Sequence, residues 1–134
     1  MSKNFSLLEL IHSDTAIKEG FTEQSQPPND VIDNLTALAD NVLQPLRDAY
    51  GKPITVNCGY RCKRVNDAVG GVANSQHLTG EAADITTNGD NEIIFNLIQS
   101  LNLPFDQLLN ESNLSWVHVS HSSSGKQRKQ ILSL

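Results

Sequence analysis

Three residues of this chain offer the nitrogen and oxygen ligands that zinc accepts in proteins. His77 and Asp84 lie in the run from Ser75 to Ile85, and His118 lies in a second segment, Trp116 to Ser120. Neutral imidazoles and carboxylates bind zinc, and three protein ligands leave a fourth position for water or substrate. The pattern therefore indicates a hydrolytic metal site with one Zn²⁺ per chain.

Small residues surround the first two candidate ligands. Gly80 permits a sharp turn that brings His77 back over the segment carrying Asp84. Residues two apart in a strand share a face, so Ala82 and Asp84 point to one side and Ala83 to the other. We expect Asp84 to face a cleft from a rigid strand, which holds a ligand more accurately than a loop does.

The second segment also alternates between apolar and other residues. If residues 116–120 form a strand, Trp116, His118 and Ser120 share one face, and Val117 and Val119 face the core. We therefore expect His118 to be held in place by apolar neighbours in sequence.

The segments that position these residues follow helical and strand periodicities. We predict a helix at the capping box Ser6–Glu9, and a main amphipathic helix from Val31 to Leu46 that Pro45 interrupts near 41–44 and Gly51 ends. A further helix follows Asp90. The remaining predictions are a helix over 63–69 and strands over 54–57, 82–86, 105–109, 115–120 and 130–134. Helices first and strands later favour an α+β fold, with a small, mainly antiparallel sheet packed against N-terminal and central helices.

Composition limits the possible functions. The chain has 134 residues, which suits a single domain over 1–134, and its net charge of −5 argues against a nucleic-acid partner. The basic cluster 126–129 is short, and we interpret it as a solvated surface segment. No apolar run is long enough for membrane insertion, and no secretion signal is visible at the start of the sequence. We expect a monomer with two free thiols.

Four short motifs carry a family resemblance. They are Cys58-Gly59-Tyr60-Arg61, Val69-Gly70-Gly71, the run from Ser75 to Ile85, and Trp116-Val117-His118-Val119-Ser120. They resemble the zinc peptidases typified by D-Ala-D-Ala carboxypeptidases and phage L-Ala-D-Glu endopeptidases, of which the hedgehog signalling domain is a structural relative. The resemblance extends from roughly Phe5 to the C-terminus.

This resemblance implies roles for individual residues. Zinc would be held by His77, Asp84 and His118, and Arg61 would stabilise the oxyanion at the scissile carbonyl. Zinc lowers the pKa of a coordinated water towards about 7 and polarises a carbonyl group. We also predict that a further set contacts the substrate or orients the ligands: Ser75, Gln76 and Trp116. A structural ion pair is the alternative role for Arg61.

Peptide hydrolysis also needs a group that accepts the proton of the attacking water. Glu111 is our candidate, because a turn after it would bring it towards His118, and Asp106 is the second choice. Several family members carry a carboxylate at the position of Ser115, and others carry a histidine at the position of Trp116. A solvated loop acid is the alternative interpretation of Glu111.

Together these features predict a zinc metallopeptidase that hydrolyses amide bonds of bacterial cell-wall stem peptides, as a carboxypeptidase or an endopeptidase. We expect it in the cytoplasm as synthesised, as for phage or prophage endolysins, and released to the wall by a separate membrane-opening protein. The alternative is a non-catalytic zinc-containing binding module on the same fold. We assign no chemistry to Cys58, and we interpret His12 and His121 as ordinary, partly buried imidazoles.

Overall fold

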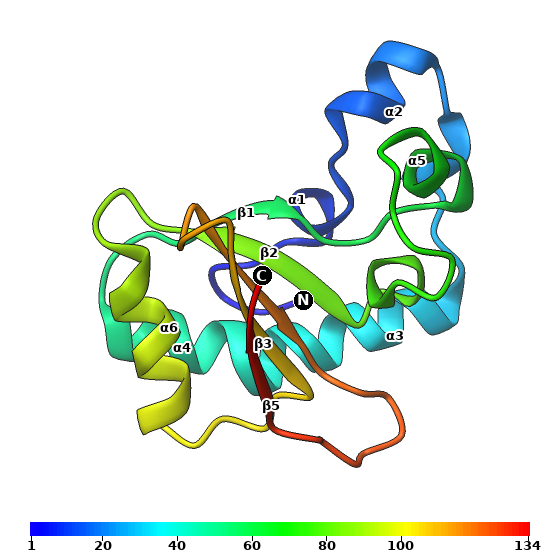
Figure 1. Ribbon diagram of the computed structural model, residues 1–134. Helices are drawn as coiled ribbons and strands as arrows, with labels where there is room; N and C mark the ends of the chain where they lie inside the picture. The colour runs from blue at the N-terminus through cyan, green and yellow to red at the C-terminus, as the bar shows by residue number, and fades with distance from the viewer.

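A single five-stranded sheet forms the centre of the computed structural model, which describes residues 1–134 (Figure 1). The strands are β1 (Thr55–Cys58), β2 (Ala82–Thr86), β3 (Gln107–Glu111), β4 (Trp116–Ser120) and β5 (Gln130–Ser133), in the order β1-β2-β4-β3-β5. All pairs are antiparallel except β3 with β5. The predicted α+β fold with a mainly antiparallel sheet is therefore confirmed.

The chain forms six α-helices: α1 (Leu7–Ile11), α2 (Asp14–Glu19), α3 (Asn29–Leu38), α4 (Gln44–Tyr50), α5 (Lys63–Ala68) and α6 (Asn91–Ser100). Of these, α1, α2 and α6 begin at residues whose side chains cap the first turn. Ser6 Oγ accepts a hydrogen bond from the Glu9 backbone N–H at 3.2 Å, and the Asp90 side chain accepts one from Glu92 N–H at 2.9 Å. These bonds confirm both predicted helix starts, since such caps satisfy donors that have no partner within the helix.

The main amphipathic helix is disturbed before Pro45, as predicted. Residues Ala39–Leu43 form a π-helical turn between α3 and α4, and the N–H of Gln44 bonds to the carbonyl of Ala39, five residues earlier. Proline has no N–H to donate, and wider turns of this kind accommodate such a local disruption. The helix ends at Gly51, whose φ is +74°.

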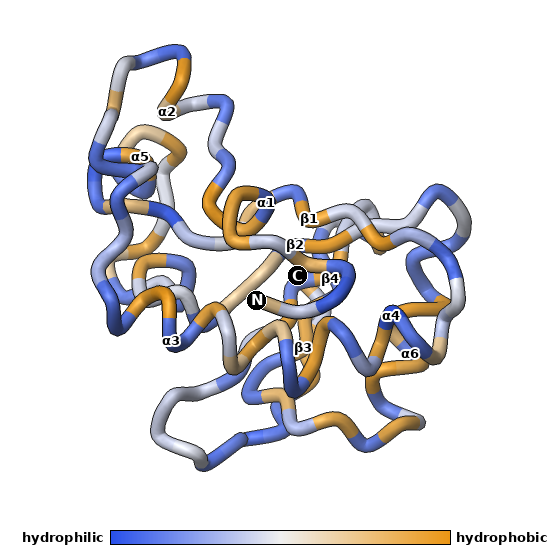
Figure 2. Tube along the Cα trace, turned by 180° about the vertical axis from the view of Figure 1, so that it is seen from behind, coloured by the Kyte–Doolittle hydropathy of each residue, from blue (hydrophilic) through white to orange (hydrophobic).

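One face of the sheet packs against α3, α4 and α6. Five sheet residues on this face have no exposed surface and belong to one apolar core with the helices: Ala83, Ile85, Leu108, Val117 and Val119. The burial of Val117 and Val119 was predicted. Figure 2 shows hydrophobic stretches in these helices and strands, interleaved with hydrophilic positions. None of the helices combines the length and the apolar composition needed to cross a bilayer.

The structure differs from the sequence prediction in the third and fifth strands. The segment predicted over 105–109 pairs as Gln107–Glu111, because Leu103 and Phe105 insert into the core before the strand begins. Strand β5 is exposed along its length and runs parallel to β3. Propensity alone cannot set such bounds, since strand pairing and packing decide them.

Candidate metal centre

His77 lies in a short 3₁₀ turn, Gln76–Thr79, between α5 and β2. Ser75 Oγ accepts a hydrogen bond from the His77 backbone N–H at 3.2 Å, as expected of a residue that orients this histidine. The side chain is 3 % exposed, and its Nδ1 lies 2.7 Å from the Gly59 carbonyl oxygen. Because a carbonyl only accepts, Nδ1 must donate, so Nε2 is the ring nitrogen that can bind a metal.

Gly80 closes this turn and directs the chain into β2. Its φ is +77°, a region that L residues with side chains rarely adopt. A Cβ at this position would also lie 2.8 Å from the Val31 carbonyl oxygen in α3. Both observations explain why glycine is required where the sequence predicted a turn.

Asp84 and His118 are directly paired across β2 and β4. Asp84 Oδ1 lies 2.9 Å from His118 Nδ1 and 3.3 Å from His77 Nε2. The two imidazole rings meet edge to face, with centroids 5.1 Å apart. The structure therefore brings the three predicted metal ligands together around one carboxylate oxygen.

Charge is concentrated in this cluster. Burial lowers the pKa of His77, but its hydrogen bond to Asp84 and the adjacent Cys58 outweigh that effect and raise it to about 10. Burial raises the pKa of Asp84, but hydrogen bonds from His118 and His77 bring it well below its usual range. In the metal-free protein His77 and Asp84 thus form an ion pair, and a metal ion must displace a proton from His77 to bind.

The donor set fits zinc. Nitrogen and oxygen ligands bound tetrahedrally at 2.0–2.2 Å are separated from one another by roughly 3.4 Å. The distance between His77 Nε2 and Asp84 Oδ1 is 3.3 Å, and that between His118 Nδ1 and Asp84 Oδ1 is 2.9 Å. Each histidine nitrogen therefore lies at a suitable separation from the carboxylate oxygen for the two to share a zinc ion.

A cleft of about 440 Å³ opens beside Asp84. Arg61 and Trp116 line it, as expected of residues that meet a substrate, and residues 12–15 at the start of α2 form another part of its wall. The Arg61 backbone N–H bonds to the His77 carbonyl at 3.0 Å. Its side-chain Nε is buried without a hydrogen-bond partner, which is an unsatisfied donor beside the cleft.

The predicted proton acceptor, Glu111, lies on the same face of the sheet as His118 but outside the residues that line the cleft. A turn does form after it, and Glu111 pairs with Trp116 while Leu109 pairs with His118. The assignment of Glu111 stays a prediction. The cleft contains a carboxylate that the sequence did not single out, namely Asp14.

His12 joins Asp14 at the rim of the cleft. Its Nε2 lies 2.8 Å from Asp14 Oδ1, and the two side chains are 58 % and 96 % exposed. The interpretation of His12 as a partly buried imidazole was therefore wrong. Sequence periodicity did not place these two residues at the cleft, because α2, which begins at Asp14, has only six residues and shows too little periodicity to be recognised.

Asp106 supports the histidine turn and is already fully engaged. It is buried, and it accepts hydrogen bonds from the Arg128 backbone and guanidinium at 2.8–3.0 Å and from Gln76 Nε2 at 3.1 Å. The Arg128 guanidinium lowers the pKa of Asp106 to about 2. The Asp106 carboxylate therefore fixes the side chain of Gln76. The basic cluster 126–129 is not merely a solvated surface segment, because Arg128 binds Asp106.

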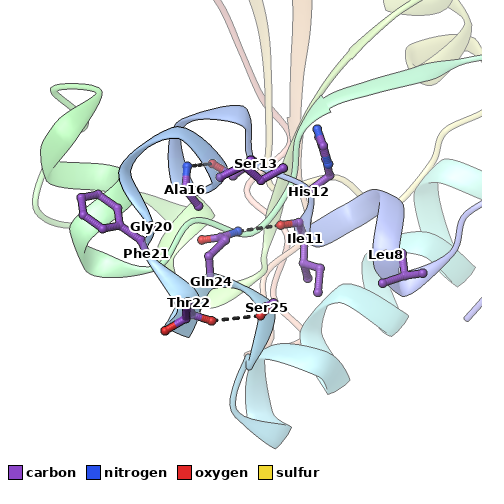
Figure 3. A pocket seen from close by; sticks show the side chains of 11 residues that line it. Leu8, Ile11, His12, Ser13, Ala16, Gly20, Phe21, Thr22, Gln24 and Ser25 are labelled. Carbon is purple, nitrogen blue, oxygen red and sulfur yellow. Dashed lines mark hydrogen bonds between the residues drawn. The ribbon is translucent and has the colours of Figure 1, made fainter.

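A second cavity of about 400 Å³ lies between α1, α2 and the turn Thr22–Ser25 (Figure 3). It shares His12 and Ser13 with the metal cleft, but its lining is largely apolar. The buried Gln24 side chain at its edge donates to the Ile11 and Tyr60 carbonyls, both at 2.8 Å. Of the proposed metal ligands, Asp84 lines the first cleft, and none of the three lines this second cavity.

Cys58 lies beside the predicted ligands, although the sequence assigned it no chemistry. Ligand atoms of Cys58, His77 and Asp84 all lie within 4.8 Å of one another. Its pairing with Asp84 across β1 and β2 explains this position. No local sequence signal indicates that pairing, because the two residues lie far apart along the chain.

Comparison with known proteins agrees with this geometry. A protein-family model described as Peptidase M15 matches residues 3–120. Over 44 residues the chain is 54 % identical to a protein of Streptomyces albus G named zinc D-Ala-D-Ala carboxypeptidase. That alignment covers 32 % of this chain and spans only 17 % of the length of the relative.

Proposed function

This chain belongs to the peptidase M15 family, and from that premise we propose that it is a zinc-dependent peptidase that hydrolyses amide bonds of bacterial cell-wall stem peptides. The observation that carries the proposal is the convergence of His77, Asp84 and His118 beside a cleft. The name of the Streptomyces relative, which specifies a D-Ala-D-Ala bond, supports the substrate class.

The chain would hold the metal through His77 Nε2, Asp84 Oδ1 and His118 Nδ1. Bound zinc supplies a Lewis acid and lowers the pKa of water, so that hydrolysis proceeds at neutral pH. The Gly59 carbonyl fixes the tautomer of His77, and Ser75 orients its backbone. Such partners of metal ligands are typically worth about 10- to 100-fold in metal affinity or activity.

Arg61 would stabilise the charge that develops on the scissile carbonyl oxygen. Its Nε has no partner within the protein, and the residue lines the same cleft as Asp84. A donor that is already in place loses little free energy to reorganisation during the reaction, and removing one such donor typically costs about 10²- to 10³-fold in rate.

Two carboxylates are candidates for the proton acceptor. Glu111 is two residue pairs along the sheet from His118, and Asp14 lines the cleft. A general base must reach the attacking water and then deliver the proton to the leaving amine. Substitution of each carboxylate by its amide separates the two, because the amide keeps the shape but cannot accept a proton in this way.

The test is digestion of defined muropeptides by the zinc-loaded protein, followed by mass spectrometry. One substrate ends in D-Ala-D-Ala and the other contains an L-Ala-D-Glu bond, so the products separate carboxypeptidase from endopeptidase activity. We expect product from the wild type and none from His77→Ala. Of Glu111→Gln and Asp14→Asn, the inactive variant identifies the base.

A non-catalytic zinc-binding module is the second candidate, and the position of Glu111 outside the cleft lining favours it. A zinc-loaded wild type that yields no product from either muropeptide would overturn the peptidase proposal. Binding of the intact muropeptide under those conditions, measured by calorimetry, would support the module.

A further inference from the structure

Cys58 is a sulfur donor on the same face of the sheet as the metal ligands. It pairs with Asp84 across β1 and β2 just after an irregularity in register between Val56 and Cys58, and both residues line the metal cleft. Cys58 Sγ lies 3.7 Å from His77 Nδ1, the ring nitrogen that faces the Gly59 carbonyl, whereas Nε2 of the same ring is the proposed metal ligand. With Asp84 these residues form a group whose ligand atoms all lie within 4.8 Å of one another.

The thiol has no strong partner of its own. Its contact with the Gly59 carbonyl is 3.8 Å long, and His77 Nδ1 already donates to that same carbonyl at 2.7 Å. Cys58 is half-buried, lines the metal cleft and forms no disulfide. The sulfur is therefore available to a cation held by His77 and Asp84.

We propose that Cys58 is a fourth protein donor, which binds the metal as a thiolate while no substrate occupies the cleft. On binding, the S–H bond breaks, its proton passes to solvent, and a sulfur lone pair forms the bond to the metal; no atom is oxidised or reduced. This inference rests on the metal site of the proposed function.

Such a donor regulates the site. Catalytic zinc sites keep one coordination position open, whereas four protein ligands close the tetrahedron. Substrate must then displace the Cys58 sulfur before the metal can act on a carbonyl group. A thiolate also shifts the preference of the site towards softer metals such as zinc, and away from magnesium and manganese.

Cobalt substitution tests for the metal–sulfur bond directly. The wild-type protein loaded with Co²⁺ should show a sulfur-to-cobalt charge-transfer band in the near ultraviolet, and Cys58→Ser should lack it. Cys62→Ser is the matched control, because Cys62 is buried at the start of α5 and is not part of the metal-ligating group. The Cys62→Ser control should keep the band. In the wild-type protein, addition of the muropeptide that serves as substrate should weaken the band.

Alkylation of the wild-type protein gives a second readout that depends on no variant folding. Zinc should slow iodoacetamide modification of Cys58 by about tenfold or more, since a coordinated thiolate is a poor nucleophile. The alkylation rate of Cys62, measured by mass spectrometry of the peptide that contains it, should not change with zinc. A slower rate at Cys62 would indicate that zinc reduces the accessibility of the whole protein.

The outcomes separate this inference from the proposed function. Bound cobalt with no charge-transfer band, or a band that survives in Cys58→Ser, overturns the role of Cys58 and leaves the peptidase proposal standing. Zinc protection without the band places the sulfur beside the metal but not on it, which also overturns the inference. A protein that binds neither cobalt nor zinc overturns both.

Discussion

The two faces of the central strands differ in what they contribute to the molecule. Asp84 and Ile85 are neighbours in β2, yet Asp84 lies in the metal cluster and Ile85 is fully buried in the apolar core. His118 and Val119 show the same contrast in β4. Because strand side chains alternate in direction, one strand can serve a reactive site and a core at once.

The energetics of the two faces also differ. Burial of Ile85 and Val119 stabilises the fold through removal of apolar surface from water. The ion pair of His77 and Asp84 contributes little net stability, because desolvation of the charges offsets their attraction. The metal face is therefore arranged for a ligand rather than for stability, and substitutions on the two faces should separate these effects.

Asp84→Ala should have the largest effect. It removes the carboxylate that both histidines contact, so zinc affinity and peptidase activity should fall by more than about 100-fold, the upper range for loss of a mere partner of a ligand. The far-ultraviolet circular dichroism spectrum should stay native. Stoichiometric zinc in the purified variant, measured by plasma mass spectrometry, would contradict the assignment.

Ile85→Ala, one residue further, should show the opposite pattern. Loss of a fully buried isoleucine side chain should lower the free energy of unfolding by about 2–5 kcal/mol, measured by urea titration. At urea concentrations below the unfolding midpoint, the variant should still bind one zinc ion per chain. Unchanged stability together with lost zinc would show that the two faces are not energetically separate.

Acid should lower the free energy of unfolding by protonating Asp106, which supports the turn that carries His77. The pKa of Asp106 is lowered to about 2, so its contribution of about 2 kcal/mol is present above pH 3.8 and is lost as the pH falls towards 2. The expected difference is a steeper loss of stability in the wild type than in Asp106→Asn over this range. Parallel urea curves for the two proteins at each pH would rule out this role.

Ser6→Ala should have the smallest effect, because Ser6 lies on neither face and only caps α1. Loss of the cap should cost about 1 kcal/mol of stability. Zinc binding and muropeptide cleavage should match the wild type. A change in the zinc affinity of Ser6→Ala would mean that a loss of fold stability is enough to lower zinc affinity. The loss of zinc in Asp84→Ala would then not show that Asp84 is a ligand.

Several features of the fold could be predicted from local sequence. The helix start at Ser6, the end of the main helix at Gly51 and the alternation of residues 116–120 each depend on contacts within a few residues. The ends of Ala82–Thr86 were also predicted correctly, since a turn precedes this strand and polar residues follow it. Local caps, turns and periodicity act over these short distances.

By itself, the sequence determined which chemical groups could bind a metal and which way their strands present them. Only the tertiary structure decided which other groups join them: Cys58 reaches the cluster through strand pairing, Asp14 enters the cleft through a short helix, and Asp106 is occupied by Arg128. Alternation and turn chemistry follow from the covalent chain, whereas the proximity of distant residues depends on register and on packing of the whole core.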